Sequence, residues 1–139
     1  PESRITGLDL SPHMLAKARR KTEKFCSRVE LRREDYSRPL DPQGFELVVF
    51  SYCLSMINPG WEQAVIAADQ DLVPGGRVAV VDFHHSAISA FRAWMGMNHV
   101  RLDGHLVPFL KSMFPRHRAV VRKGYGGLWS YVIFTGQKI

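Results

Sequence analysis

Short apolar runs alternate with helical stretches along this chain of 139 residues, and this alternation constrains the fold more than any other feature. Runs of strand length are predicted at 5–10, 29–31, 45–50 and 77–82. Helices are predicted at 12–24 and 61–72, with Pro74, Gly75 and Gly76 ending the second helix and turning the chain. Strands that alternate with helices favour parallel neighbours in a sheet. The sequence therefore predicts an α/β fold with a mostly parallel sheet.

The last third of the chain has a different pattern. Helices are expected at 86–97 and 105–113, followed by strands at 118–123 and 129–135. Three glycines, Gly124, Gly126 and Gly127, separate the two strands. Glycine-rich connections of this length are typical of hairpins, so we expect a C-terminal antiparallel hairpin. A single domain over 1–139 is the simplest organisation for a chain of this length.

Asp9 ends the first predicted strand, and a capped helix follows it directly. Ser11 suits the N-cap and Pro12 the first helical position. In nucleotide-binding α/β folds an acid at such a strand end accepts both ribose hydroxyls, because a carboxylate offers two acceptor oxygens. A purely structural capping role for Asp9 is the alternative. Met14, Leu15, Ala18 and Phe25 are predicted to line the inner face of the helix.

The run from Gly7 to Arg19, GLDLSPHMLAKAR, resembles the second-strand motif of class I S-adenosylmethionine-dependent methyltransferases. Three further stretches resemble later motifs of that family in the expected order: Glu34–Tyr36, Phe45–Ser51 and Leu72–Gly76. The resemblance covers residues 5–82 and implies a Rossmann-like sheet with S-adenosyl-L-methionine as cofactor. It also implies that Asp9 binds the ribose, Leu10 and Met14 pack against the adenine, Asp35 contacts its amino group, Tyr36 lies beside the ring, and Ser51 ends the strand where the methyl group is transferred.

The glycine-rich strand and turn that normally open this fold have no counterpart in these 139 residues. The resemblance implies that the missing first strand belongs between the strands ending at Asp9 and Ser51. A sheet with that slot empty would leave backbone donors and acceptors unpaired. We therefore expect about 40–80 further residues before Pro1, or another segment in the slot, and poor cofactor binding by the chain as it stands.

Stretches of the C-terminal half resemble bacterial lipid-amine N-methyltransferases, which methylate phosphatidylethanolamine or the homoserine headgroup of betaine lipids. These stretches are 51–57, 80–83, 103–106 with 109–110, and 131–138. Two alternatives stay open. One is O- or N-methylation of a soluble small molecule such as a quinone precursor. The other is a degenerate, non-catalytic binding module, which the missing glycine loop favours.

Five side chains are candidates for the acceptor site. An amine acceptor must lose a proton before methyl transfer, so His84, His85 and Tyr52, which follow predicted strands, are candidates for that step. Tyr125 and Trp129 of the hairpin offer aromatic faces to a methylated ammonium. A surface or capping role for the histidines, and a core or turn role for the aromatic residues, is the alternative in each case.

The formal charge of +6 favours anionic partners, including an acidic membrane face. Nucleic acid is not expected, because the stretch Ser51–Leu54 lacks the Asn-Pro-Pro-Tyr-like motif of base methyltransferases. Cys26 and Cys53 make no disulfide framework, and no Cys or His pair has zinc-ligand spacing. Apolar runs are far shorter than the roughly 20 residues of a membrane-spanning helix. We expect a cytoplasmic protein, with peripheral membrane contact as a further possibility.

Overall fold

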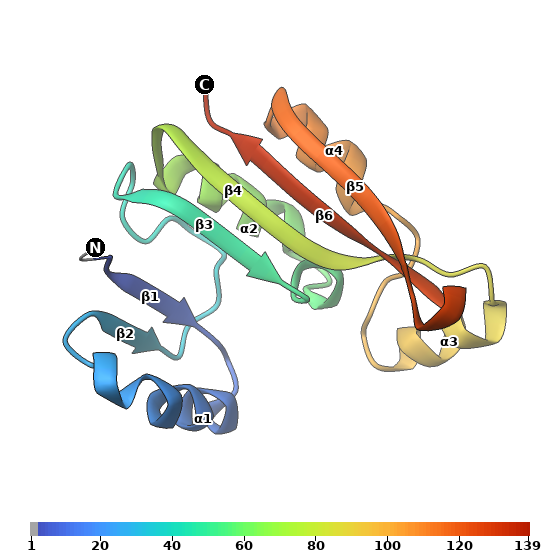
Figure 1. Cartoon of the computed structure of the whole chain (residues 1–139), viewed down its shortest axis with the longest axis horizontal. Helices are drawn as coiled ribbons and strands as arrows, with labels where there is room; N and C mark the ends of the chain where they lie inside the picture. The colour runs from blue at the N-terminus through green and yellow to red at the C-terminus, as the bar shows by residue number, and fades with distance from the viewer. Residues whose placement is uncertain (1–2) are drawn as a thin grey trace. The chain divides into compact units, whose positions relative to one another are not determined.

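The computed structural model describes residues 3–139 and separates the chain into two compact units, Pro1–Tyr36 and Ser37–Ile139. We call them the N-terminal and C-terminal units (Figure 1). Among the described residues, no helix has the length and apolar character needed to cross a membrane.

The N-terminal unit is a strand–helix–strand motif. It contains β1 (Ile5–Leu8), α1 (Pro12–Thr22), the 3₁₀ turn η1 (Glu23–Phe25) and β2 (Val29–Arg32). The two strands pair in parallel, with Leu8 opposite Arg32. The predicted cap is confirmed, because the Ser11 side chain accepts a hydrogen bond of 3.3 Å from the Met14 amide. The strand ends at Leu8 rather than at Leu10.

The inner face of α1 is narrower than predicted. Leu15 is the buried residue of the helix, and Ala18 is half-buried. Met14 and Phe25 are about half exposed, so their predicted place on the inner face was wrong. The cause is the small size of the unit, because a sheet of two short strands covers little of the helix beyond Leu15.

The C-terminal unit is a four-stranded mixed sheet with helices. Its elements are β3 (Phe45–Ser51), η2 (Leu54–Met56), α2 (Trp61–Asp71), β4 (Leu72–His85), α3 (Ser89–Met97), α4 (Leu106–Met113), β5 (Arg116–Gly124), η3 (Tyr125–Gly127) and β6 (Trp129–Gln137). The strand order is β3-β4-β6-β5. β3 and β4 are parallel, whereas β6 is antiparallel to both β4 and β5. The predicted α/β fold with a C-terminal antiparallel hairpin is confirmed.

The core of this unit lies between one face of the sheet and the helices α2 and α4, which Figure 1 shows on the same side. Alternate residues of β4 and β6 point into it and are fully or almost fully buried: Val78, Val80, Val132 and Phe134. Ala64, Val65 and Ala68 of α2 and Leu110 of α4 are buried with them. On the other face, Leu47, Val49 and Ile133 are 40–59% exposed.

β4 is longer than predicted at both ends. Pro74, Gly75 and Gly76 lie inside the strand as an irregularity, because the register with β3 jumps from Phe45–Leu72 to Leu47–Arg77. Gly75 has a φ of +79°, which glycine adopts without strain. The Gly75 amide donates to the Lys138 carbonyl, and the Lys138 amide donates to Gly76. The run is therefore a bulge that the C-terminal strand holds in place, and the prediction of a turn that separates helix from strand was wrong.

Candidate functional site

In the N-terminal unit, the cofactor candidates gather at the carboxyl ends of the two parallel strands. Asp9 follows β1, and its amide donates to the Arg32 carbonyl at 3.3 Å, which continues the ladder past Leu8. The guanidinium of Arg33 donates to the Leu10 carbonyl at 3.1 Å. The segment after β1 is thus tied to the segment after β2. Such strand ends are where open α/β folds bind nucleotides.

The Asp9 carboxylate has a local structural role. Its Oδ1 accepts a hydrogen bond of 2.7 Å from the Ser11 amide, which fixes the chain as it enters α1. This contact supports the chain just before the helix, whereas the helix itself is capped by Ser11. It leaves a ribose role open, because a carboxylate has about four acceptor sites and this contact occupies one.

The remaining N-terminal candidates differ in exposure. Leu10 is 63% and Met14 50% exposed, so both apolar side chains are available to pack against a ligand. Asp35 is exposed and Tyr36 half-buried in the irregular segment after β2. Their roles toward the adenine stay predictions. Ser51 belongs to the C-terminal unit, where it is the exposed last residue of β3 and pairs with Val81.

Tyr52 directly follows β3 and is held in an unusual backbone conformation. Its φ is +51°, a region that costs a residue with a side chain about 1–3 kcal/mol. Its amide donates to the Val81 carbonyl at 2.8 Å. Strain of this kind persists where the surroundings over-determine the backbone. Here β4 holds the backbone at two neighbouring places, because the Val81 carbonyl accepts from the Tyr52 amide and a buried carboxylate of the same strand accepts from the Cys53 amide.

That carboxylate belongs to Asp82, which sequence reasoning treated only as the end of a strand. The residue is fully buried. Its Oδ2 accepts hydrogen bonds from the amides of Cys53 (3.0 Å), Leu54 (2.8 Å) and Ser55 (3.3 Å). Its Oδ1 accepts from the Ser55 hydroxyl (2.5 Å) and from the Phe83 amide (2.8 Å). Asp82 therefore fixes the segment that follows Tyr52. An acid inside an apolar strand was the available signal.

Three of the predicted acceptor residues meet in one group of rings. Tyr52 lies edge-on to Trp129, with ring centroids 6.5 Å apart, and Tyr125 lies 6.0 Å from Trp129. The Phe83 ring packs against both Tyr52 and Trp129, with centroid distances of 5.0 Å and 4.9 Å. The Tyr131 ring centroid lies 5.8 Å from that of Trp129. We call these five residues the aromatic cluster. It combines the end of β3, the end of β4 and the hairpin, and Phe83 and Tyr131 were not predicted.

The predicted histidines lie beside this cluster rather than in it. A β-bulge falls at His84, because Phe83 pairs with Tyr131 and His85 with Ser130. The His84 ring packs against the backbone of Gly104, where an added Cβ would meet its Cε1 at 3.1 Å. The Gly104 amide donates to the His84 carbonyl at 2.7 Å. His85 is exposed, and its carbonyl accepts from the Ser130 hydroxyl.

The pKa values of two candidates, Tyr52 and His84, are shifted in opposite directions. Burial, with contributions from Tyr131 and Asp82, raises the pKa of Tyr52, so its phenol stays protonated at neutral pH. Burial and the neighbouring His85 lower the pKa of His84, so its imidazole stays neutral. A neutral imidazole can accept a proton, whereas a protonated phenol donates a hydrogen bond. Tyr52 is therefore suited to orienting a ligand and His84 to removing a proton.

The strand end at His85 is braced by the segment that contains Asp103. The two residues form an isolated antiparallel bridge. Although burial raises the pKa of Asp103, hydrogen bonds from Arg101 and His105 outweigh it and lower the value to about 2. The Asp103 carboxylate is thus ionised at neutral pH, and it holds the loop that contacts His84.

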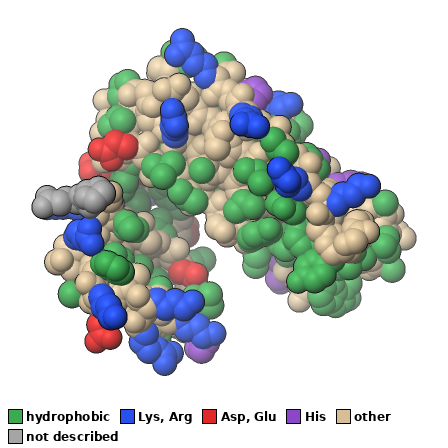
Figure 2. Space-filling model, in the orientation of Figure 1, with side chains coloured by type: hydrophobic (Ala, Val, Ile, Leu, Met, Phe, Trp, Pro, Cys, Tyr) green, Lys and Arg blue, Asp and Glu red, His purple; other side chains and the backbone are tan. Residues whose placement is uncertain are grey.

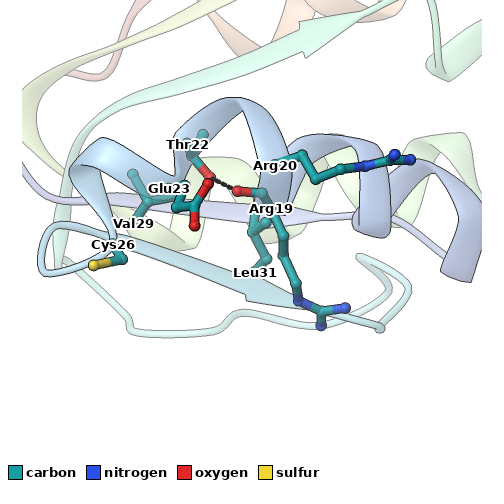
Figure 3. Close-up of a pocket in the computed structure, with 7 residues that line it drawn as sticks. All are labelled: Arg19, Arg20, Thr22, Glu23, Cys26, Val29 and Leu31. Atoms are coloured by element: carbon teal, nitrogen blue, oxygen red, sulfur yellow. Dashed lines mark hydrogen bonds between the residues drawn. The ribbon is translucent and has the colours of Figure 1, made fainter.

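A groove of about 420 Å³ lies in the N-terminal unit, between α1 and the start of β2 (Figure 3). Arg19, Arg20, Thr22, Glu23, Cys26, Val29 and Leu31 line it. The Thr22 hydroxyl donates within it to the Arg19 carbonyl at 3.5 Å. None of these residues is a predicted site residue, and the groove lies at the end of α1 away from Asp9. Among the described residues, no group of three or more Cys, His, Asp or Glu side chains forms a metal site.

Comparison with known proteins identifies the family of this chain. The family model for a methyltransferase domain matches residues 1–76, more than half of the chain. The chain belongs to the methyltransferase-domain family. The match includes the cofactor candidates from Asp9 to Ser51, as well as Tyr52.

A curated relative of this methyltransferase domain is the 2-phytyl-1,4-naphthoquinone methyltransferase of Thermosynechococcus vestitus. The two are 32% identical over 96 residues, which are 67% of this chain and 42% of the relative. The chain thus spans less than half the length of that relative.

Solved structures of methyltransferases share the fold. The N-methyltransferase NodS from Bradyrhizobium japonicum, in complex with S-adenosyl-L-homocysteine, matches with a TM-score of 0.75 at 18% identity, over 97% of this chain and 66% of that one. Phosphoethanolamine N-methyltransferase 2 of Haemonchus contortus matches with a TM-score of 0.81 at 16% identity, over 97% and 43%.

Proposed function

We propose that the protein carrying this methyltransferase domain transfers a methyl group from S-adenosyl-L-methionine to a small molecule that binds at the aromatic cluster. The family membership supports the chemistry. The location is supported by the ring contacts of Trp129 with Tyr52 and Tyr125, next to the ends of β3 and β4. Asp9, Leu10, Met14, Asp35 and Tyr36 in the N-terminal unit, and Ser51, are the proposed contacts to the cofactor.

In this proposal the protein contributes position rather than a covalent intermediate. When bound, S-adenosyl-L-methionine would supply the methyl group, and the residues around the acceptor would lower the barrier by placing its attacking atom correctly. Tyr52 orients the acceptor through its protonated phenol. His84, neutral at neutral pH, takes the proton that the acceptor loses. His85 is the alternative base, since it is exposed beside the same strand end.

We propose an amine of a lipid headgroup as the acceptor, because electron-rich ring faces attract an alkylated ammonium. The ring of a quinone precursor is the second candidate. It is favoured by the likeness to a 2-phytyl-1,4-naphthoquinone methyltransferase, and flat rings pack well against aromatic side chains. Both acceptors are compatible with the same five residues.

The test is methyl transfer from radiolabelled S-adenosyl-L-methionine by the full-length gene product, with phosphatidylethanolamine and a reduced phytyl-naphthoquinone offered separately. Trp129→Leu is expected to lower kcat/KM for the true acceptor about tenfold, because a ring face is lost. KM for the cofactor should stay unchanged. Phe25→Leu, at an exposed aromatic residue of the N-terminal unit, is the matched control.

Each outcome has a distinct meaning. Transfer to one lipid class identifies the acceptor. If Trp129→Leu changes the cofactor KM and leaves the acceptor KM untouched, the cluster is not the acceptor site. Cofactor binding without transfer to any offered compound would leave the degenerate binding module as the better description.

A further inference from the structure

The C-terminal unit exposes a set of large apolar side chains at the end that carries α3 and the hairpin turn. Ile88 is 47%, Trp94 54%, Met97 73% and Tyr125 85% exposed. We call these four residues the α3 surface. Figure 2 shows hydrophobic side chains gathered at this end, with Lys and Arg side chains beside them.

The helix α3 is apolar on both of its sides. Phe91 and Met95, one turn apart, face inward and pack with Val100, Leu102 and Phe83. Ala90, Ala93, Trp94 and Met97 have the i, i+3, i+4, i+7 spacing of a single helix face, and all four are exposed. A surface helix normally presents polar residues on its outer face. The outer face of α3 is therefore built to contact something apolar.

Hydrogen bonds connect the start of α3 to the hairpin turn. The Ser86 hydroxyl donates to the Leu128 carbonyl at 2.6 Å and accepts from the Ile88 amide at 3.2 Å. The Arg92 guanidinium donates to the Ser86 carbonyl at 2.6 Å. The start of α3 is thus fixed next to the turn that contains Tyr125.

The part of the chain that contains α3 and the hairpin is rich in basic residues. Residues 83–139 contain eight Lys or Arg and one acid, Asp103, whereas residues 1–82 contain eleven Lys or Arg and twelve acids. Asp103 is itself paired with Arg101. Arg92 on α3 and Lys123 beside the turn flank the α3 surface. A cationic rim around exposed Trp, Tyr, Met and Ile side chains matches an anionic bilayer surface.

We propose that the α3 surface docks onto an anionic lipid bilayer, with α3 lying in the interface and Lys123 and Arg92 against the headgroups. A nucleic acid would be attracted by the basic residues, but it would not cover the apolar outer face of α3. A second copy would bring two cationic rims together. This docking site deepens the proposed lipid acceptor, and its test measures binding without methyl transfer, so either proposal can fail alone.

The experiment is sedimentation of the full-length gene product with vesicles, either of phosphatidylglycerol and phosphatidylcholine in equal parts or of phosphatidylcholine alone. We expect binding to the anionic vesicles at low salt, its loss at about 0.5 M salt, and weak binding to the neutral ones. The double variant Trp94→Ser, Met97→Ser should bind at least about tenfold more weakly, since most of the inserted apolar area is removed. Lys123→Glu should weaken binding and reduce its salt dependence.

Met56→Ser is the matched control, because Met56 is a 48% exposed methionine of the same unit outside the α3 surface. It should bind like the wild type. Equal binding of the double variant and the wild type overturns the proposal, as does binding to neutral and anionic vesicles alike. Binding to a homopolymeric RNA in preference to vesicles, or self-association abolished by the double variant in the absence of vesicles, also overturns it.

Discussion

Replacing Asp82 by alanine is expected to lower the free energy of unfolding of the C-terminal unit by about 3–5 kcal/mol. The variant leaves four backbone amides and the Ser55 hydroxyl without their acceptor in a buried place. Each unsatisfied buried group costs about 1–3 kcal/mol, and partial rearrangement reduces the sum. Urea unfolding followed by circular dichroism measures the change.

Two further variants show whether the effect comes from the hydrogen bonds. Asp82→Asn keeps one acceptor oxygen and should lose roughly half as much stability. Asp103→Ala removes an acid whose side chain is 49% exposed, and it should cost less than about 1 kcal/mol. If Asp82→Ala is no more harmful than Asp103→Ala, the buried carboxylate does not hold the segment after Tyr52.

The second large effect is expected at Asp9. In the full-length gene product, Asp9→Ala should weaken S-adenosyl-L-methionine binding by about 1–3 kcal/mol, because the ribose hydroxyls lose their charged acceptor. Calorimetric titration gives the affinity directly. An affinity equal to that of the wild type would show that Asp9 has no more than its local structural role.

The local structural role of Asp9 needs its own control, since the Ser11 amide donates to this carboxylate. Ser11→Ala removes the side-chain cap on the Met14 amide at the same helix start. It should lower stability by about 0.5–2 kcal/mol and leave cofactor affinity unchanged. A loss of affinity in both variants would mean that the shape of the helix start, rather than the Asp9 charge, governs binding.

The fold was predicted well where the signal is local. The apolar runs located the strands, and Ser11 with Pro12 located the start of α1, because caps and periodicity act within a few residues. The Pro74–Gly76 run was misassigned, because its partners are Gln137 and Lys138 at the other end of the chain. The exposure of Met14 and Phe25 was also missed, since a helical pattern does not say how wide its sheet is.

Only part of the candidate site was predicted, because residue types can be read from the sequence and the order of the strands cannot. Tyr52, Tyr125 and Trp129 were chosen by residue type, and β4 between β3 and β6 brings them together. Asp82 was missed as a functional residue, because its donors lie 27 to 29 residues earlier in the chain. His84 was expected to follow the strand, whereas it lies inside β4, at a bulge that depends on the pairing with β6. The roles of these residues in binding and transfer stay predictions.

We propose that this chain belongs to an S-adenosyl-L-methionine-dependent enzyme. The most direct test is calorimetric titration of the full-length gene product with S-adenosyl-L-methionine and with S-adenosyl-L-homocysteine. We predict saturable one-site binding of both ligands, with Asp9→Ala weaker for each. Heats no larger than dilution for both ligands, in a protein whose circular dichroism shows it to be folded, would contradict the claim.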